Sequence, residues 1–198
     1  VDDRDTESYY KEESYGYKVE KEVMDKDGVS AAAICAEMTL YWASQGKSIL
    51  EHLNDMWKEY GFFEDRSISQ NFPGSAGKET MAGIMSKLRT EGLSTLGGKN
   101  VVEIKDIQES VTFNPSSPSE KKPLDLPKSN VIQFVLEGGT IVSARPSGTE
   151  PKIKFYINAR TEVSGAKCDG CLANAKKMSG ELCDSISQDI KNMLNEAL

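Results

Sequence analysis

The sequence lacks an apolar run of the roughly 20 residues that a membrane-spanning helix requires. It also lacks a signal peptide, because residues 1–5 are mostly acidic and no apolar segment follows them. No initiator methionine is present, so we expect a fragment or a processed product. These absences argue against a membrane or secreted protein and predict a cytoplasmic one.

Basic residues are not in excess, since 24 Lys and Arg face 31 Asp and Glu and the net charge is −7. Nucleic-acid binding needs a strongly basic face, so we expect no nucleic-acid partner.

Histidine is nearly absent, and the single His52 is predicted to lie on the surface among polar residues. The cysteines are typical of reduced thiols in a cytosolic protein. Cys168 and Cys171 have C-x-x-C spacing but no second pair, and we interpret them as two thiols in a loop rather than a zinc or redox site; the others are Cys35 and Cys183.

The chain up to about residue 61 is predicted to be mainly helical. Asp27 is the expected N-cap of a helix that stops near Gly46. Ser48 and Glu51 form a capping box that opens a second helix, and Gly61 ends it. One or two helices and a loop bury too little apolar surface to form an independent core. We therefore place a domain boundary here and assign residues 1–61 to the end of a domain.

The remainder, residues 62–198, has the pattern of an α+β domain. Glycines 138 and 139 predict a tight hairpin between two strands, and a polar loop with four prolines covers 114–127. This order favours an antiparallel sheet with helices on one face. The expected strands are 62–68, 99–107, 130–136, 140–144 and 152–159, and the expected helices are 75–90 and 173–197.

Residues 144–152, A-R-P-S-G-T-E-P-K, link two of these strands. The guanidinium of Arg145 presents forked donors that fit a phosphate. Ser147 and Thr149 add hydroxyls, and Gly148 permits a backbone nest that faces an anion. The same residue types also form ordinary exposed turns. Composition alone favours the exposed turn over the phosphate site.

The loop resembles the phosphate-binding loop of the α-D-phosphohexomutase superfamily, the phosphoglucomutases and phosphomannomutases, in which R-P-S-G-T-E-P is a signature. Residues 12–17, E-E-S-Y-G-Y, resemble the sugar-binding loop of the superfamily, and the E-E-S form is most similar to the phosphoglucomutase branch. Residues 24–28, M-D-K-D-G, resemble the R-D-K-D-G segment that follows that loop, with Met24 in place of the arginine. Tyr10 and Lys11 replace a glycine and an aromatic residue of the sugar loop.

This resemblance implies the C-terminal end of a four-domain enzyme. Residues 1–61 would end the third, sugar-binding α/β domain, and 62–198 would form the fourth, a TATA-binding-protein-like domain that binds phosphate. Lys26 would lie near the reacting centre. Glu12 and Ser14 would bind sugar hydroxyls, and the non-reacting phosphate would be held by Arg145, Ser147, Gly148 and Thr149.

The implied activity is that of an isomerase of carbohydrate metabolism, which interconverts glucose 1-phosphate and glucose 6-phosphate through an enzyme phosphoserine. Mg²⁺ and glucose 1,6-bisphosphate, the intermediate, would take part. The phosphoserine and metal loops of the superfamily do not occur in this sequence, so we expect it to be inactive without the missing N-terminal domains. The alternatives are a phosphomannomutase, a phosphopentomutase, a non-catalytic phosphosugar-binding module, and an interaction domain without phosphate affinity.

Overall fold

A computed structural model describes residues 10–12, 16–18, 26–74, 76–163 and 169–196. The chain forms two compact units, Val1–Met56 and Trp57–Leu198. The predicted domain boundary after residue 61 lies at the end of helix α2 (Ile49–Tyr60). The assignment of the two parts to a third and a fourth domain stays a prediction.

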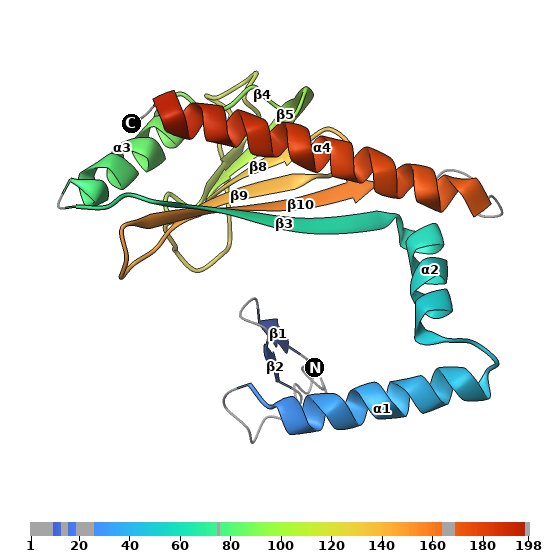
Figure 1. The fold of residues 1–198 in the computed structure, drawn as a ribbon. Coiled ribbons are helices and arrows are strands. Elements are labelled where there is room, and N and C mark those ends of the chain that lie inside the picture. Colours follow the sequence, from blue (N-terminus) through green and yellow to red (C-terminus); the bar gives the residue numbers. More distant parts are fainter. Residues whose placement is uncertain (1–9, 13–15, 19–25, 75, 164–168, 197–198) are drawn as a thin grey trace. The chain divides into compact units, whose positions relative to one another are not determined.

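The first unit contains a short hairpin and a long helix, and the predicted helix start is confirmed. The Asp27 carboxylate accepts the N–H groups of Val29 at 2.9 Å and Ser30 at 3.3 Å, as an N-cap does. The bonds from Ser30 and Val29 hold the pKa of Asp27 below its usual value. The backbone N–H of Asp27 donates to the carbonyl of Tyr17 at 2.8 Å, which ties the helix start to the hairpin. The elements are β1 (Tyr10–Glu12), β2 (Gly16–Lys18), α1 (Gly28–Ser44) and the beginning of α2 (Figure 1).

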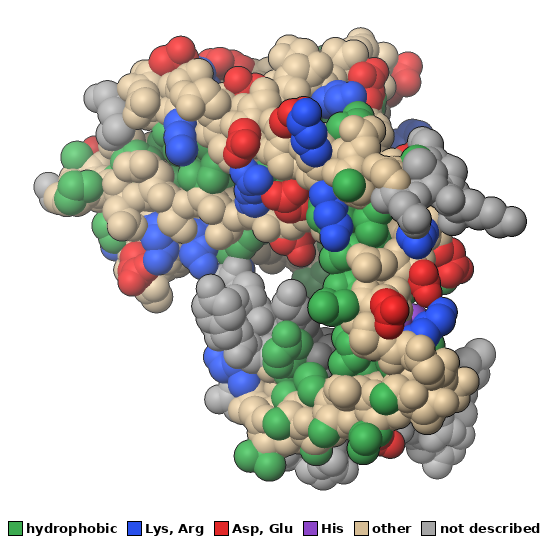
Figure 2. Space-filling view, turned by 45° about the vertical axis from the view of Figure 1, so that its right-hand side comes forward, with side chains coloured by type: hydrophobic (Ala, Val, Ile, Leu, Met, Phe, Trp, Pro, Cys, Tyr) green, Lys and Arg blue, Asp and Glu red, His purple; other side chains and the backbone are tan. Residues whose placement is uncertain are grey.

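Helix α1 leaves its apolar surface exposed. None of its residues, all of which the structure describes, is buried. Val29 is 81% exposed and Leu40 is 72% exposed, and Figure 2 shows apolar side chains along the helix. A helix that is apolar on most sides normally lies inside a larger core. The first unit therefore presents an apolar surface that its own described elements do not cover.

The predicted capping box is present at the start of α2. Ser48 N–H donates to Glu51 Oε2 at 2.7 Å, and Glu51 N–H donates to Ser48 Oγ at 3.2 Å. The prediction for His52 needs correction, because its ring is half-buried and stacks on Trp42 with ring centroids 3.6 Å apart. This contact joins α2 to α1.

The second unit is an antiparallel sheet covered on one face by two helices, and this confirms the predicted α+β class (Figure 1). The strand order is β3-β10-β9-β8-β5-β6-β7, and β4 pairs with β5. The strands are β3 (Phe62–Asn71), β4 (Thr95–Leu96), β5 (Lys99–Asp106), β6 (Val111–Phe113), β7 (Lys122–Pro123), β8 (Ile132–Leu136), β9 (Ile141–Pro146) and β10 (Lys152–Thr161), and the helices are α3 (Gly77–Thr90) and α4 (Asp169–Glu196).

The core lies between the helices and the inner face of the sheet. Alternate residues of β10, Ile153, Phe155 and Ile157, are at most 1% exposed. Burying side chains of this size contributes roughly 1.5–3 kcal/mol each. The intervening residues of the same strand point to the other face, which carries neither α3 nor α4. The sheet therefore has one apolar face and one polar face.

Two details of this unit differ from the sequence prediction. Strands β4, β6 and β7 were not expected, because two or three residues are too few to show an alternating pattern. Helix α4 begins at Asp169 rather than at 173, because Leu172 and Ala175 pack against Phe62 in a small second core. Cys171 therefore lies on the first turn of a helix and not in a loop, whereas Cys168 is outside the described residues. In the part of the chain that the structure describes, no helix has the length and apolarity to cross a membrane.

Candidate functional site

The loop between β9 and β10 begins on the polar face of the sheet. Arg145 of β9 lies directly opposite Lys154 of β10. A hydrogen bond of 2.8 Å from Ser147 N–H to the carbonyl of Lys152 continues the same register by one more pair. Because side chains alternate along a strand, these four residues share one face. The register thus places a guanidinium, a hydroxyl and two ammonium groups together at the end of two strands.

Hydrogen bonds within the loop also hold its backbone. Ser147 Oγ accepts the backbone N–H groups of Thr149 at 3.4 Å and Glu150 at 3.2 Å. The carbonyl of Glu150 accepts the N–H of Lys152 at 2.8 Å. Gly148 is not among the glycines with positive φ, so the expected nest is not formed in this structure. Two of the amides expected to face an anion are instead bonded to the serine hydroxyl.

The base of the loop is fixed to the rest of the sheet. The N–H of Phe72, at the end of β3, donates to the carbonyl of Pro151 at 2.8 Å. Phe72 is itself only 2% exposed and belongs to the main core. Arg145, Gly148 and Thr149 are exposed. The loop therefore presents its polar groups to solvent from a rigid base.

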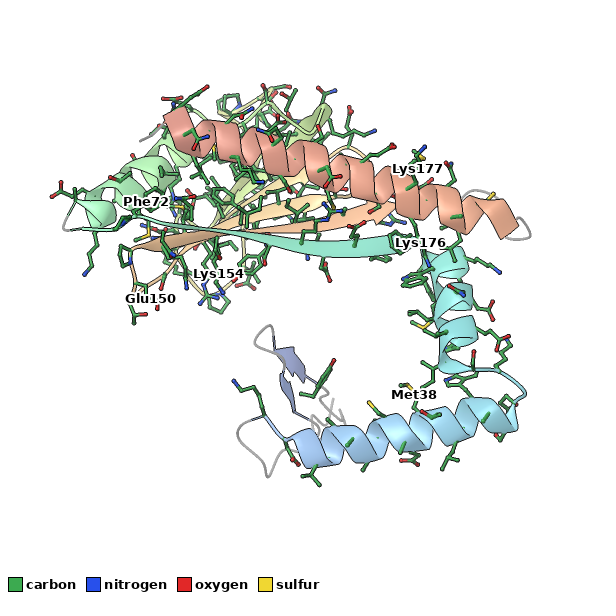
Figure 3. The ribbon with its side chains drawn as sticks, viewed as in Figure 1. Met38, Phe72, Glu150, Lys154, Lys176 and Lys177 are labelled. Carbon is green, nitrogen blue, oxygen red and sulfur yellow. The ribbon has the colours of Figure 1, made fainter. Side chains whose placement is uncertain are left out.

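The charge around the loop is mainly positive. Among the described residues, no hydrogen bond or ion pair engages the Arg145 guanidinium. Lys154 Nζ lies 5.8 Å from the centre of the Tyr156 ring, and Lys152 Nζ lies 2.6 Å from Glu150 Oε2. The hydrogen bond and charge of Lys152, with a smaller effect of Lys154, hold the pKa of Glu150 below its usual value. Figure 3 shows Glu150 and Lys154 on the side of the sheet away from α4. Three cations and one carboxylate give the end of the sheet a net attraction for anions.

The predicted site residues fall into two groups. Arg145 lies near the end of β9, and Ser147, Gly148 and Thr149 lie in the loop that follows it, all in the second unit. Lys26 directly precedes the N-cap of α1 in the first unit. The two groups therefore belong to different units of the chain. Glu12 ends strand β1, but its side chain is not described, and Ser14 lies outside the described residues.

Two residues of the loop region were not predicted as site residues. Lys152 and Lys154 share the face of Arg145 because they alternate with the buried Ile153 and Phe155. The sequence K-I-K-F at 152–155 shows this alternation. Pairing the two strands of the hairpin in register would therefore have placed both lysines beside Arg145.

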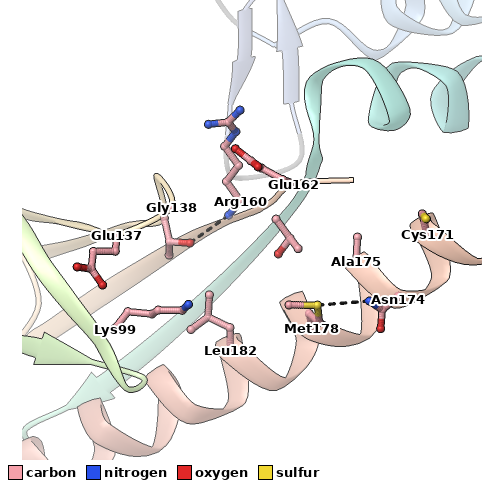
Figure 4. A pocket seen from close by; sticks show the side chains of 12 residues that line it. Lys99, Glu137, Gly138, Arg160, Glu162, Cys171, Asn174, Ala175, Met178 and Leu182 are labelled. Carbon is pink, nitrogen blue, oxygen red and sulfur yellow. Dashed lines mark hydrogen bonds between the residues drawn. The ribbon is translucent and has the colours of Figure 1, made fainter. Parts of the chain in front are cut away.

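A separate pocket of about 390 Å³ lies near the opposite end of β10 (Figure 4). Lys99 points toward Leu182 of α4, and Asn174 Nδ2 donates to Met178 Sδ at 3.5 Å. The pocket lies about 30 Å from the loop, given the rise of a strand. Acidic and basic side chains both line it, so its charge indicates no one class of ligand. The residues that line it are Lys99, Glu137, Gly138, Thr140, Arg160, Thr161, Glu162, Cys171, Asn174, Ala175, Met178 and Leu182.

Known proteins resemble the chain in sequence. The profile of the family described as "Phosphoglucomutase/phosphomannomutase, C-terminal domain" matches residues 87–175, which include the β9–β10 loop. A phosphoglucomutase of Staphylococcus haemolyticus (strain JCSC1435) is 30% identical over 162 residues, 82% of this chain and 29% of that protein. A phosphoglucomutase of Staphylococcus saprophyticus is 33% identical over 151 residues, 76% of this chain and 27% of that protein. The chain thus spans less than a third of the length of these relatives.

Among solved structures, the chain resembles the open form of the Paramecium exocytosis-sensitive phosphoprotein pp63/parafusin, which is also named a phosphoglucomutase. The likeness covers 89% of this chain and 30% of that one, with 18% identity and a TM-score of 0.48.

Proposed function

The chain belongs to the phosphoglucomutase/phosphomannomutase family through its C-terminal domain, and on this premise we propose that it is the phosphate-binding part of a phosphoglucomutase-type enzyme. The proposed reaction interconverts glucose 1-phosphate and glucose 6-phosphate. In it a phosphoryl group passes from an enzyme phosphoserine to the free sugar hydroxyl, giving glucose 1,6-bisphosphate. The other phosphoryl group of that intermediate then returns to the serine.

The observation that carries this proposal is the open guanidinium of Arg145 beside Ser147 and Lys154 on the polar face of the sheet. Charge-assisted hydrogen bonds from a guanidinium fork suit a phosphate dianion. The exposure of Arg145 and Thr149 leaves these groups accessible. The loop is therefore suited to hold the phosphate that does not react.

In this proposal the loop positions the substrate and transfers nothing itself. Phosphoryl transfer depends mostly on positioning and charge stabilisation. Binding energy from the distant phosphate is used to orient the reacting end of the sugar. Among the described residues, no three carboxylate, imidazole or thiol side chains come together as a metal site would require. We assign Mg²⁺ to other domains as part of this proposal, because the metal loop of the superfamily does not occur in this sequence, and no step here depends on it.

The first unit would contribute the sugar-binding groups. We assign Glu12 and Ser14 to the sugar hydroxyls and Lys26 to the neighbourhood of the reacting phosphate. The hydrogen bond from Asp27 to Tyr17 supports this assignment, because it holds the hairpin beside the start of α1. The exposed apolar surface of α1 supports the further domains that the proposal requires. A cytoplasmic location is part of the proposal and agrees with the free thiols of Cys35 and Cys183.

The same loop would serve a phosphomannomutase or a phosphopentomutase, because in this proposal it holds the phosphate and not the sugar. A non-catalytic phosphosugar-binding module is the alternative from another class, in which the same loop would bind phosphate without turnover. Turnover of glucose 1-phosphate by a longer protein containing this chain separates the enzyme from the module.

The proposal is tested by titrating the chain with inorganic phosphate and with glucose 6-phosphate while backbone amide shifts are recorded. We expect shifts concentrated at residues 145–154 and lost in Arg145→Ala. Affinity should be weak, because the relatives have further domains that would add contacts. Shifts confined to other regions, or unaffected by Arg145→Ala, would contradict the phosphate assignment.

A further inference from the structure

Glu150 places a carboxylate among the cations of the proposed phosphate site. We propose that the Glu150 carboxylate competes with phosphate for that site. It forms an ion pair with Lys152, and a phosphate dianion must displace it to bind the Lys152 ammonium group. This inference rests on the proposed function and adds a control on which anions the loop accepts.

The geometry joins Glu150 to both sides of the site. Its carboxylate lies 2.6 Å from Lys152 Nζ, and its backbone N–H donates to Ser147 Oγ at 3.2 Å. Any anion that the Ser147 hydroxyl binds therefore lies within about one side-chain length of this carboxylate. Lys152 in turn lies opposite Ser147 in the strand register. The competitor and the expected ligand thus share the same ammonium group.

The ion pair can be exchanged at low cost. The Glu150 side chain is 61% exposed, and Lys152 is 25% exposed. Exposed pairs of this kind contribute little to stability. Lysine is a point charge on a flexible stem, so its ammonium group moves from carboxylate to phosphate without a fixed geometry. The pair therefore opens when a stronger anion arrives.

Glu150 therefore makes the loop select anions by their charge. A dianion interacts with Arg145, Lys152 and Lys154 about twice as strongly as a monoanion at the same distances. A monoanion gains little over the carboxylate already present, whereas a dianion displaces it. The repulsion from Glu150 is screened by salt, so its effect is largest at low ionic strength.

The test measures the affinity of the full chain for inorganic phosphate at pH 8 and low ionic strength. Glu150→Gln should bind phosphate roughly two- to tenfold more tightly, and the gain should fade above about 0.5 M salt. In the background of Lys152→Gln the same change should give a smaller gain, because the shared ammonium group is gone. The matched control is Glu181→Gln on α4, which breaks a pair with Lys177 (3.8 Å) far from the loop and should leave affinity unchanged.

The outcomes separate this inference from the proposed function. Unchanged or weaker binding by Glu150→Gln, in a chain whose phosphate binding still depends on Arg145, overturns the competitor and leaves the phosphate site standing. An equal gain in Glu181→Gln also overturns it, because the effect is then one of net charge. A chain that binds no phosphate as wild type but does so as Glu150→Gln supports both ideas. Binding by neither form overturns both.

Discussion

Arg145 and Lys154 lie directly opposite one another on antiparallel strands, with both side chains on the polar face of the sheet. The Cβ atoms of such a pair are about 4.5–5.5 Å apart, and two like charges in this position destabilise a sheet. In the proposed function, an anion between them would remove this repulsion. The pair would then favour anion binding, apart from any hydrogen bond that the anion receives.

Replacing Arg145 should remove phosphate binding without unfolding the chain. We expect Arg145→Ala to weaken binding of inorganic phosphate at least about tenfold, because charge-assisted hydrogen bonds contribute more than neutral ones. Arg145→Lys should recover only part of the loss, since an ammonium group lacks the planar fork. Isothermal titration calorimetry measures the affinities. Arg160→Ala, which removes an exposed arginine at the other end of β10, is the matched control, and an equal loss there would contradict the site.

Two parts of the structure were predictable, the helix caps of the first unit and the facing of β10 in the second, because local chemistry determines them. Asp27 and the Ser48–Glu51 pair cap helices through contacts three residues or fewer apart. The alternation of Lys152, Ile153 and Lys154 determines which residues face the core. Patterns of this kind need no knowledge of the rest of the fold.

The features that sequence reasoning missed depend on packing between distant segments or on backbone geometry. His52 was predicted to be a surface residue, yet its position depends on Trp42 in another helix. The start of α4 depends on Phe62, more than 100 residues earlier in the chain. The hydroxyl of Ser147 bonds to two loop amides, which composition does not determine.

Two glycines of α3 should respond oppositely to alanine. A Cβ at Gly77 would lie 2.0 Å from the carbonyl oxygen of Phe72, whereas a Cβ at Gly83 would meet nothing within 4 Å. We expect Gly77→Ala to lower the free energy of unfolding by about 2–4 kcal/mol, because buried backbone must move. Gly83→Ala should raise it by about 0.5–1 kcal/mol through helix propensity. Urea denaturation measures both, and changes of the same sign would refute the packing at Gly77.

The buried carboxylate of Asp106 should contribute strongly to stability. It is 5% exposed, accepts the N–H groups of Gln108 and Glu109 at 3.1 and 3.3 Å, and pairs with Arg89 of α3 at 3.2 Å. Asp106→Ala leaves these donors without a partner, so we expect a loss of about 3–5 kcal/mol in unfolding free energy. Asp184→Ala breaks an exposed pair with Arg66 and should cost less than about 1 kcal/mol. Chemical denaturation compares the two variants, and equal losses would contradict the special role of burial.

The thiol of Cys183 should make stability depend on pH in the alkaline range. The residue is fully buried in the core, and burial raises the pKa of its thiol from 9.0 to about 11. The unfolded chain therefore ionises this thiol before the folded chain does. The resulting stabilisation is complete below pH 9 and is lost as the pH rises through about 11.

Cys183→Ala should be less stable at neutral pH, because it leaves a cavity, but its stability should fall less steeply between pH 9 and 11. Denaturation curves at several pH values measure the difference in slope, which isolates this group from others that titrate in the same range. Alkylation at pH 8 gives an independent check, since the exposed Cys35 should react much faster than Cys183. Parallel stability curves for wild type and Cys183→Ala would show that the thiol ionises equally in both states, and its burial would then be refuted.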